Sequence, residues 1–484
     1  MCLFSPAPHA LTSLLARARS FLTPIAPVLL LIAIWATLSP PVAAQQDFFL
    51  VVSRVQYDGN NFGNPNPYPQ IFNDPTVSGV QGSIHLDLYL PFPNTPALFS
   101  LPLPTSSITT SFSSKSEGAL TRSVDGHFLT YIGYNGPDGA EGVSNSYTTE
   151  ANLSGNANPL YDREVAMVSA DGAMTFQNES NAYSGDNPRA VITVDGTQFY
   201  MAGNSDSTIT NGTGPGTTIG ARFGTPGSNQ SVQLGVYLAT DRPDESKKQH
   251  VKDNNFRGIG IYNGNLYVSK GSGGNGDDGI FQVEKGTSNG LPTGTGNTIV
   301  QLLGEPATDP VTGNSAPDVP FGFFFANPRT LYVADEGYPN LDANGNLIPD
   351  PRAGLQKWSL VNGTWQLDYI LTDGLNLLQA VNIPGYPAPT YTYGLRNMTG
   401  KVNWDRTVTI YAITAQYSTF SNGEPDPTNL VAVTDRISAT TEDRHHHRLD
   451  HFVTLQNSGY GQVFRGVAFA PVPKLQPRDR GPAE

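Results

Sequence analysis

Residues 187–204, NPRAVITVDGTQFYMAGN, decide the fold predicted for this chain. An apolar stretch follows Arg189, Asp195-Gly196 forms a polar pair, and a second apolar stretch contains Phe199 and Tyr200. Alternating apolar positions around an Asp-Gly turn are typical of a β-hairpin. The segment therefore predicts two antiparallel strands, with an arginine at the start of the first.

The same pattern recurs along the chain. An arginine, an apolar stretch, a polar turn and a second strand rich in Tyr or Phe appear again in residues 120–135, 255–271 and 394–414, and residues 463–471 repeat the first strand alone. A further copy, residues 320–337, has Phe321-Gly322 where the earlier copy has Arg257-Gly258. The chain therefore contains six copies of one hairpin unit.

The spacing of the copies indicates a repeat architecture. Intervals of 67, 68, 139 and 69 residues separate Arg122, Arg189, Arg257, Arg396 and Arg465. The copy without arginine divides the interval of 139 into two. Second hairpin-like pairs, such as those that start near Val165 and Leu355, lie between the copies and bring each repeat to about four strands. Four-stranded units that recur at this length predict an all-β fold, a β-propeller of six blades.

Composition agrees with this fold class. The 50 Gly and 39 Pro, with only 14% charged residues, suit many short strands joined by turns and exclude a coiled coil or a helix bundle. The segment 47–59 looks like a second strand without a first, and 463–471 like a first strand without a second. We expect the two to pair and close the ring. Seven blades remain the alternative if residues 60–116 or 332–411 contain another sheet.

Two of the copies, 187–204 and 255–271, resemble the repeats of the NHL and YVTN propeller families. The units of those families carry a Pro-x-Gly-hydrophobic strand, an Asp-Gly turn and a Leu-Tyr-Val strand. The resemblance covers the repeat cores and implies the architecture. Those families include lactonase-like hydrolases, lyases and binding scaffolds, so the resemblance implies no single activity. The period of about 69 residues is longer than their usual unit, and no functional residue is carried over.

The N-terminal segment predicts export. Arg17 and Arg19 precede an apolar stretch, residues 21–38, which is followed by Val42-Ala43-Ala44. These are the parts of a secretory signal peptide, and an uncleaved N-terminal anchor is the alternative. We expect a signal peptide at 1–44, one propeller domain at 45–473 and a polar tail at 474–484. The only cysteine, Cys2, lies in the signal, so the mature chain would fold without disulfides.

Charge narrows the class of partner. Loss of residues 1–44, which hold two arginines and no acid, would change the net charge from −13 to −15. Nucleic-acid binding needs a basic stripe, so we expect no nucleic acid as a partner. We expect an extracellular, periplasmic or cell-surface location, with an extracellular ligand or protein as partner and an anionic glycan among the candidates. The mature chain would have no membrane span.

The repeated arginines are the first candidate site. If Arg122, Arg189, Arg257, Arg396 and Arg465 occupy equivalent points of the blades, they form a ring of cations suited to a carboxylate or sulfate ligand. The alternative is structural. An arginine that recurs in every repeat can also bind carbonyl or carboxylate groups of the adjacent blade, and close cations repel one another.

Two further segments carry metal-ligating residue types. Oxygen ligands alternate around Gly345, which suits a structural Ca²⁺ site formed by Asp342, Asn344, Asn346 and Asp350, although Pro351 stands where a bidentate Glu would be needed. A plain turn-rich loop is the alternative. His445, His446, His447 and His451 could bind Zn²⁺ or Cu²⁺, or form a solvated, pH-responsive loop.

Catalytic signatures do not decide the function. The sequence lacks a Gly-x-Ser-x-Gly elbow, a His-Glu-x-x-His pair and a phosphate-binding Gly-x-x-x-x-Gly-Lys loop. We therefore expect a secreted or cell-surface propeller that acts as a ligand-binding or protein-interaction scaffold and requires no cofactor. The alternative is an extracellular propeller enzyme, a hydrolase or lyase on an anionic glycan or a lactone-type substrate.

Overall fold

The computed structural model describes residues 47–474, with gaps at 57–80, 112–115, 138–139, 141, 151–159, 206–219, 236–254, 272–277, 286–289, 296, 305–318, 338–339, 343–346, 387, 419–426 and 443–448. The predicted signal peptide and nearly all of the predicted tail lie outside these residues. Within the described part of the chain, no helix is long and apolar enough to cross a membrane.

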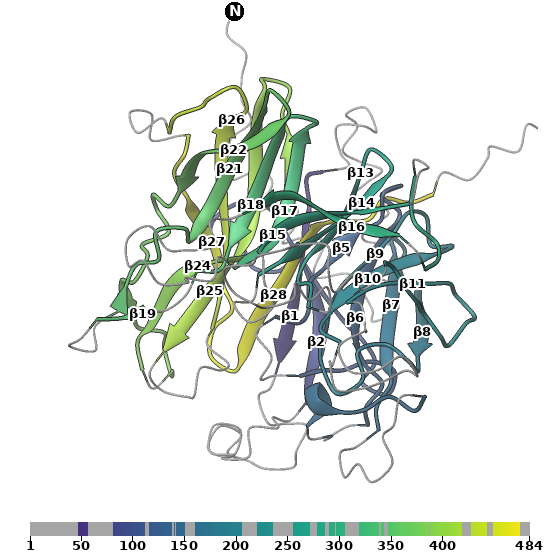
Figure 1. The fold of residues 1–484 in the computed structure, drawn as a ribbon. Coiled ribbons are helices and arrows are strands. Elements are labelled where there is room, and N and C mark those ends of the chain that lie inside the picture. The colour runs from purple at the N-terminus through teal and green to yellow at the C-terminus, as the bar shows by residue number, and fades with distance from the viewer. Residues whose placement is uncertain are drawn as a thin grey trace, which may run out of the picture.

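The described residues form six antiparallel sheets of four or five strands, which are the blades, and one separate two-stranded sheet (Figure 1). Blade 1 consists of β28 (Gln462–Phe469), β1 (Leu50–Gln56), β2 (Gln81–Tyr89) and β3 (Phe99–Pro102), with β4 (Thr110–Ser111) beside β2. Blade 2 consists of β5 (Thr121–Arg122), β6 (Phe128–Tyr134), β7 (Arg163–Ser169) and β8 (Met174–Glu179). Blade 3 consists of β9 (Pro188–Thr193), β10 (Phe199–Gly203), β11 (Ala221–Gly224) and β12 (Val232–Gln233).

The remaining blades have the same order. Blade 4 consists of β13 (Ile259–Tyr262), β14 (Asn265–Lys270), β15 (Gly279–Glu284) and β16 (Thr298–Gly304). Blade 5 consists of β17 (Pro320–Asn327), β18 (Thr330–Asp335), β21 (Gly354–Val361) and β22 (Thr364–Leu371), with the small hairpin of β19 (Asn340–Leu341) and β20 (Leu347–Ile348) between its second and third strands. Blade 6 consists of β24 (Thr390–Val402), β25 (Thr407–Ser418), β26 (Asn429–Arg436) and β27 (Val453–Asn457), with β23 (Ala380–Val381) beside β24.

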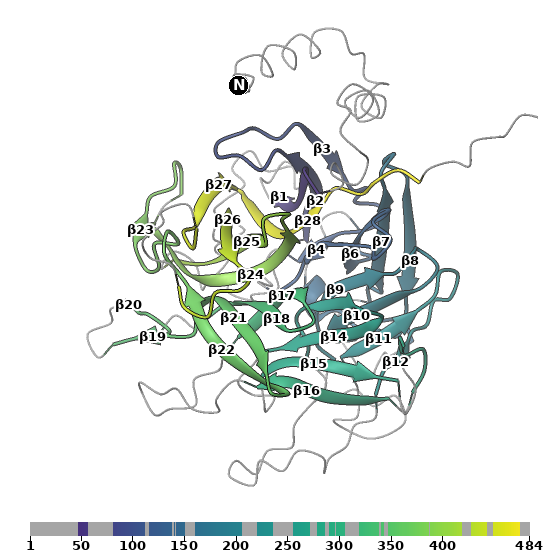
Figure 2. The ribbon, with the colours of Figure 1, turned by 90° about the horizontal axis from the view of Figure 1, so that it is seen from above.

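The blades form a closed ring. Contacts run in a cycle through the six innermost strands, β28, β5, β9, β13, β17 and β24, and back to β28 (Figure 2). The two stretches that could have held a seventh blade do not. Within 60–116, β2, β3 and β4 belong to blade 1, and within 332–411, β21, β22 and β24 belong to blades 5 and 6. The fold is a six-bladed β-propeller, as the repeat predicts.

The two ends of the chain close the ring as predicted. β28 pairs antiparallel with β1, from Leu50 opposite Phe469 to Gln56 opposite Gln462. Blade 1 is thus built from both ends of the chain. Its inner strand buries Val463, Phe464, Val467 and Phe469 completely or nearly so, and β1 is left with no open edge.

The hydrophobic core lies between adjacent blades. One cluster joins Ala190, Ile192 and Tyr200 of blade 3 to Val268 and Phe281 of blade 4. Another joins Tyr332 and Leu355 of blade 5 to Ile410 and Val431 of blade 6. Inner and second strands such as β9, β10 and β18 are buried on both faces, so they are more continuously apolar than the half-exposed outer strands such as β22. This packing fixes each inner strand against the next.

The propeller has two distinct ends. At the turn end, short turns join the first strand of a blade to the second, as at Asp195-Gly196 and Asn263-Gly264. At the other end, which we call the loop end, the inner strands begin, and the longer connections 135–162 and 336–353 lie there. In Figure 1 the turn end is at the top and the loop end at the bottom. Both ends of the described chain, Asp47 and Lys474, lie at the turn end, since β1 begins there and β28 ends there.

Candidate functional site

A β-bulge recurs near the start of the inner strands, at the loop end. In blade 3 the pairing passes from Pro188 opposite Gly203 to Ala190 opposite Ala202, so Arg189 is the extra residue. In blade 4 Ser269 pairs with two successive residues: it accepts from Arg257 N at 2.9 Å and donates to Gly258 O at 3.0 Å. A bulge changes the direction in which the side chain of its extra residue points. Each arginine therefore departs from the regular alternation of side chains between the two faces of its strand.

Three other blades repeat the irregularity. It covers Arg396 and Asn397 in β24, Arg465 in β28, and Phe321-Gly322 in β17. Phe321-Gly322 therefore occupies the place of Arg257-Gly258, as the sequence predicts. Burial is nearly complete for Arg189, Arg396 and Arg465, while the Arg257 side chain keeps 15% of its surface.

The bulges bind each blade to the next around the ring. Ala119 N donates to Arg189 O at 3.2 Å, and Arg189 Nη1 to Phe256 O at 3.3 Å. Ser269 Oγ donates to Phe321 O at 2.5 Å, Asn397 Nδ2 to Arg465 O at 3.1 Å, and Ser53 Oγ to Gly118 O at 2.9 Å. These contacts join blade 2 to 3, 3 to 4, 4 to 5, 6 to 1 and 1 to 2. The sixth junction, between blades 5 and 6, is made by Arg396 Nη2, which donates to Glu336 Oε1 at 3.0 Å. The start of the inner strands is thus a hydrogen-bonded ring.

Glycine allows the blades to approach closely in this ring. A Cβ on Gly258 would lie 2.3 Å from Phe321 O, and a Cβ on Gly322 would lie 2.9 Å from Arg396 O. A Cβ on Gly466 would lie 2.3 Å from Leu120 N. In each case the obstacle is the backbone of the next blade, which cannot rotate away. In the Arg-Gly pair of the repeat, the arginine side chain therefore makes polar contacts, and the glycine allows the backbone of the next blade to approach closely.

Arg122 does not belong to this ring. It pairs with Leu129 beside the turn at 123–127, whereas Arg189 lies at the other end of its strand. Its Nη2 forms an ion pair with Asp47 at 2.6 Å, and its guanidinium lies over the Phe469 ring. The residue of blade 2 that bonds to Arg189 is Ala119. Ala119 is therefore the residue of blade 2 at the level of Arg189, and Arg122 lies three positions further along the strand. The interval of 67 residues did not reveal this difference, because β5 starts later in its blade than the other inner strands.

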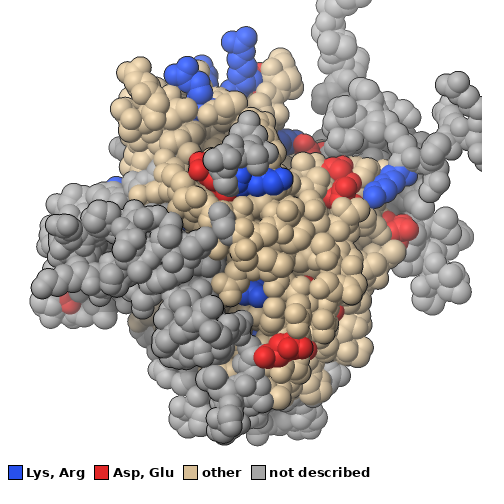
Figure 3. Space-filling view, turned by 45° about the vertical axis from the view of Figure 1, so that its right-hand side comes forward, with Lys and Arg blue, Asp and Glu red and all other residues tan. Residues whose placement is uncertain are grey.

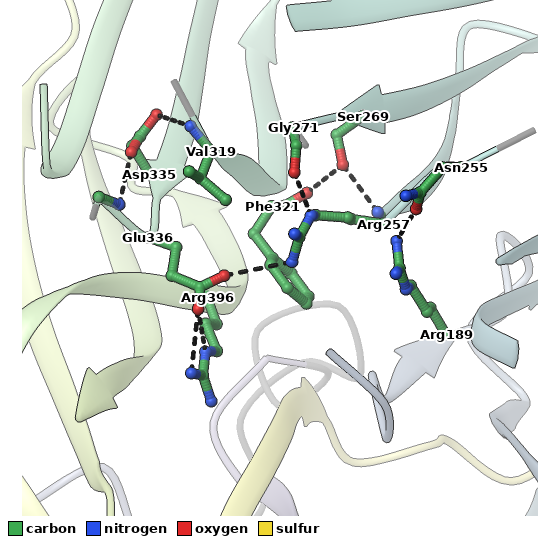
Figure 4. Close-up of polar contacts among 12 residues, drawn as sticks. Arg189, Asn255, Arg257, Ser269, Gly271, Val319, Phe321, Asp335, Glu336 and Arg396 are labelled. Carbon is green, nitrogen blue, oxygen red and sulfur yellow. Dashed lines mark hydrogen bonds and ion pairs between the residues drawn. The ribbon is translucent and has the colours of Figure 1, made fainter. Parts of the chain in front are cut away.

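Glu336 links two of the ring arginines. Its Oε2 accepts from Arg257 Nη1 at 3.3 Å and its Oε1 from Arg396 Nη2 at 3.0 Å (Figure 4). The Tyr393 hydroxyl also donates to Oε1, at 2.9 Å. The preceding residue fixes this position. Asp335 accepts hydrogen bonds from Val319 N at 3.1 Å and from Gly337 N at 2.7 Å, which holds the end of β18 in place. Glu336 therefore joins blades 4, 5 and 6 through one carboxylate.

Glu117 is a second buried carboxylate, on the segment that leads into β5. It accepts from Thr110 Oγ1 and Ser111 N, both at 3.1 Å, from Asn187 Nδ2 at 2.8 Å, and from the Tyr134 hydroxyl. Burial raises the pKa of Glu117, and these donors together with the charge of Arg465 act in the opposite direction. Both oxygens are engaged, so this carboxylate is held in one orientation.

Arg189 has no carboxylate among its hydrogen-bond partners in the described part of the chain. Its Nη1 donates to two neutral oxygens, Asn255 Oδ1 and Phe256 O, and its Nε has no hydrogen-bond partner among the described residues. Burial, together with the nearby charge of Arg257, lowers the pKa of Arg189 to about 9. Figure 4 shows Arg257 between Arg189 on one side and Glu336 on the other. A buried cation without an anionic contact is the feature that a ligand anion would complete.

Sequence reasoning identified the arginines but missed the carboxylates. Glu117 and Glu336 lie in the connections just before an inner strand and just after a second strand, outside the repeated hairpin. Neither recurs in other blades, so periodicity gives no signal for them. A search for acidic residues that border the arginine-bearing strands in the predicted ring would have included both.

The predicted calcium segment folds as a hairpin. Asn340 pairs with Ile348 and Leu341 with Leu347. Asn344 and Asn346 lie outside the described residues. Asp350 Oδ1 accepts from Arg352 N at 2.9 Å at the start of β21. Among the residues that the structure describes, no three His, Cys, Asp or Glu side chains could together hold a metal ion. The calcium site stays a prediction.

In the sequence the four histidines lie between β26 and β27, and His451 alone among them is described. His445, His446 and His447 are outside the described residues. His451 Nδ1 lies 2.7 Å from Asp373 Oδ2, with both side chains largely exposed. This contact gives a reason for the position of His451 that requires no metal, and the metal-binding hypothesis is untested.

Comparisons with known proteins show no family. No protein family matches the sequence, and no curated protein matches it. Similar solved structures include a putative 6-phosphogluconolactonase from Bacteroides fragilis, at 11% identity over 89% of this chain and 99% of that chain, with a TM-score of 0.36. An ulvan lyase has 10% identity over 78% and 79%, with a TM-score of 0.35. The hemagglutinin-neuraminidase of parainfluenza virus 5 has 10% identity over 78% and 83%, with a TM-score of 0.34.

These similarities are too low to transfer an activity. The NHL and YVTN resemblance therefore stays a resemblance.

Proposed function

We propose that the protein is a secreted or cell-surface β-propeller that binds an anionic ligand at the loop end of its axis. The observation that carries the proposal is Arg189, a buried guanidinium whose described hydrogen bonds reach only neutral oxygens. Export rests on the N-terminal Arg17, Arg19 and apolar stretch 21–38.

The neighbours of Arg189 support an anion rather than a neutral ligand. Arg257 lies close enough to lower the pKa of Arg189, and it retains part of its surface for a ligand. Two adjacent guanidinium groups repel each other. Glu336 forms an ion pair with Arg257, whereas the hydrogen bonds of Arg189 in the described part of the chain reach only neutral oxygens. Because guanidinium binds carboxylate and sulfate through two parallel hydrogen bonds, we propose a carboxylated or sulfated ligand, with acidic glycans as the class to test first.

The contacts of the two carboxylates at the ring, Glu117 and Glu336, favour a binding function over a catalytic one. A general base needs an oxygen that is available to accept a proton from the substrate. Glu117 has four donors on its two oxygens, and Glu336 is held by Arg257, Arg396 and Tyr393. The contacts of both groups suit structural roles. The enzyme alternative, a hydrolase or lyase on an anionic glycan, would need one of these contacts to open when the substrate binds.

Calorimetry with inorganic sulfate, glucuronate and an acidic oligosaccharide tests the proposal. We expect one site whose affinity falls with added salt, and about a tenfold loss in Arg257→Lys, which keeps the charge but loses the paired donors. Arg122→Lys is the matched control, because Arg122 lies at the turn end, and its affinity should be unchanged. Absence of binding to all three ligands by folded protein would exclude the proposal. Release of shorter products from the oligosaccharide would favour the enzyme.

A further inference from the structure

Trp404 is the most exposed large apolar side chain among the described residues, at 97%. It lies at the tip of the hairpin between β24 and β25, at the turn end. The tip is well fixed: Asn403 N donates to Thr407 O at 2.8 Å, and Asp405 Oδ1 accepts from Thr407 N at 3.1 Å. Val402, at the end of β24, is 49% exposed. A tryptophan side chain that an ordered turn keeps exposed to solvent indicates an interaction surface.

Blade 1 adds two phenylalanines at the same end. Phe48 is 38% exposed and Phe92 is 49% exposed, and their rings pack edge to face with centroids 6.1 Å apart. Lys401 Nζ donates to Asp47 O at 3.0 Å, which fixes this part of blade 1 to the hairpin that carries Trp404. The exposed aromatic side chains thus belong to adjacent blades.

Three exposed arginines lie at the same end in blades 5 and 6. Arg406 is part of the Trp404 turn, Arg436 is the last residue of β26, and Arg329 lies in the first turn of blade 5. Figure 3 shows Lys and Arg side chains that project from the turn end. Asp405, which is also exposed, accepts hydrogen bonds from Thr407 within the turn. The turn of Trp404 thus exposes one carboxylate and one guanidinium, Asp405 and Arg406, and Arg436 and Arg329 add two cations at the same end.

The course of the chain identifies what this end faces. The described chain begins with Asp47 at the turn end, and the apolar stretch 21–38 precedes it by nine residues. Nine extended residues span at most about 30 Å. While the apolar stretch is in a membrane, during export or as an uncleaved anchor, the turn end is therefore the part of the propeller held nearest to the bilayer.

We propose that the turn end is a lipid-contact surface for an anionic bilayer. Trp404, Phe48 and Phe92 enter the headgroup region, where aromatic residues are favoured, and Arg406, Arg436 and Arg329 lie near the lipid phosphates. The loop end with Arg189 and Arg257 then points away from the bilayer. The inference is independent of the proposed function, because the two surfaces lie at opposite ends of the propeller.

Vesicle sedimentation with a chain that begins at Gln45 tests the proposal without the apolar stretch. Every described strand lies between Leu50 and Phe469, so this chain contains the whole propeller. We expect it to sediment with phosphatidylcholine vesicles that contain one third phosphatidylglycerol, and less with phosphatidylcholine alone. Trp404→Ser should reduce the partition about tenfold, since binding scales with the apolar area that enters the interface. Brominated lipids should quench the tryptophan fluorescence of the unsubstituted chain and much less that of Trp404→Phe.

Leu160→Ser is the matched control, because Leu160 is 43% exposed and precedes β7 at the loop end. Its partition should equal that of the unsubstituted chain. The proposal is overturned if the chain does not bind anionic vesicles, if Trp404→Ser and Leu160→Ser bind equally, or if Trp404 binds a soluble glycan instead while brominated lipid leaves its fluorescence unchanged.

Discussion

Asn397 donates its side-chain amide to the carbonyl oxygen of Arg465, 68 residues later, at 3.1 Å. The separation is one repeat, and the two residues occupy the bulges of adjacent inner strands in blades 6 and 1. Side-chain to backbone hydrogen bonds also join other blades, from Arg189 to Phe256 O and from Ser269 to Phe321 O. The ring at the loop end is thus both the start of every blade and the contact between blades, so damage to it should affect the whole fold.

Loss of the Glu336 carboxylate should be costly. Glu336→Gln leaves Arg257 and Arg396 without their shared anion in a buried site, and removal of one partner from such a site typically costs about 3 kcal/mol. The free energy of unfolding in urea measures the effect. Asp47→Asn is the control, because the Asp47–Arg122 pair is partly exposed and should change stability by less than about 1 kcal/mol. Equal losses would contradict the central role of Glu336.

A methyl group at Gly466 should separate blades 1 and 2. The new Cβ would meet Leu120 N at 2.3 Å and Gly118 O at 2.8 Å, both backbone atoms. Overpacking of this kind costs about 1–3 kcal/mol, so Gly466→Ala should lower the unfolding midpoint. Gly294→Ala, where the Cβ meets no atom within 4 Å, should leave the midpoint nearly unchanged. A tolerated Gly466→Ala would show that the inner strands can move apart.

Removal of the closing strand should prevent folding. A chain that ends at Tyr460 lacks Val463, Phe464, Val467 and Phe469, and each buried apolar side chain contributes about 1.5–3 kcal/mol. The sum is comparable to the total stability of an ordinary domain, and β1 would become an open edge. We expect loss of the cooperative thermal transition. A chain that ends at Lys474 should melt like the full chain, and a normal transition in both would refute closure by β28.

Two buried glutamates should make stability depend on pH. Burial raises the pKa of Glu164 to about 8 and that of Glu179 to about 7, from an ordinary value of 4.5. Because the folded state holds these protons more tightly, their contribution is complete below pH 4.5 and is lost as pH rises toward 8. The slope is at most about 1.4 kcal/mol per pH unit for each group.

Urea midpoints between pH 5 and 9 measure this dependence. Glu164→Gln should flatten the profile and stabilise the protein at pH 8, since the amide stays neutral. Glu150→Gln, at an exposed position, should leave the profile unchanged. A stability that rises with pH in this range would show that both glutamates are ionised in the fold.

The repeat in the sequence was sufficient to predict the six blades, their four strands and the closure of β28 on β1. Each of these depends on local patterns, namely the hairpin turn at Asp195-Gly196 and its copies, because turn type and strand alternation are set by neighbouring residues. Even the copy without arginine, Phe321-Gly322, could be aligned, since its second strand repeats the Leu-Tyr-Val of residues 266–268.

The tertiary structure alone decided which side chains meet. Arg122 fits the period but lies at the turn end, whereas Glu117 and Glu336 fit no period and lie among the arginines. Periodicity fixes the distance along the chain between blades, but not the depth at which each inner strand begins. That depth depends on bulges and on the close packing of Gly258, Gly322 and Gly466 against the next blade. The composition of the candidate site is therefore a property of the assembled ring.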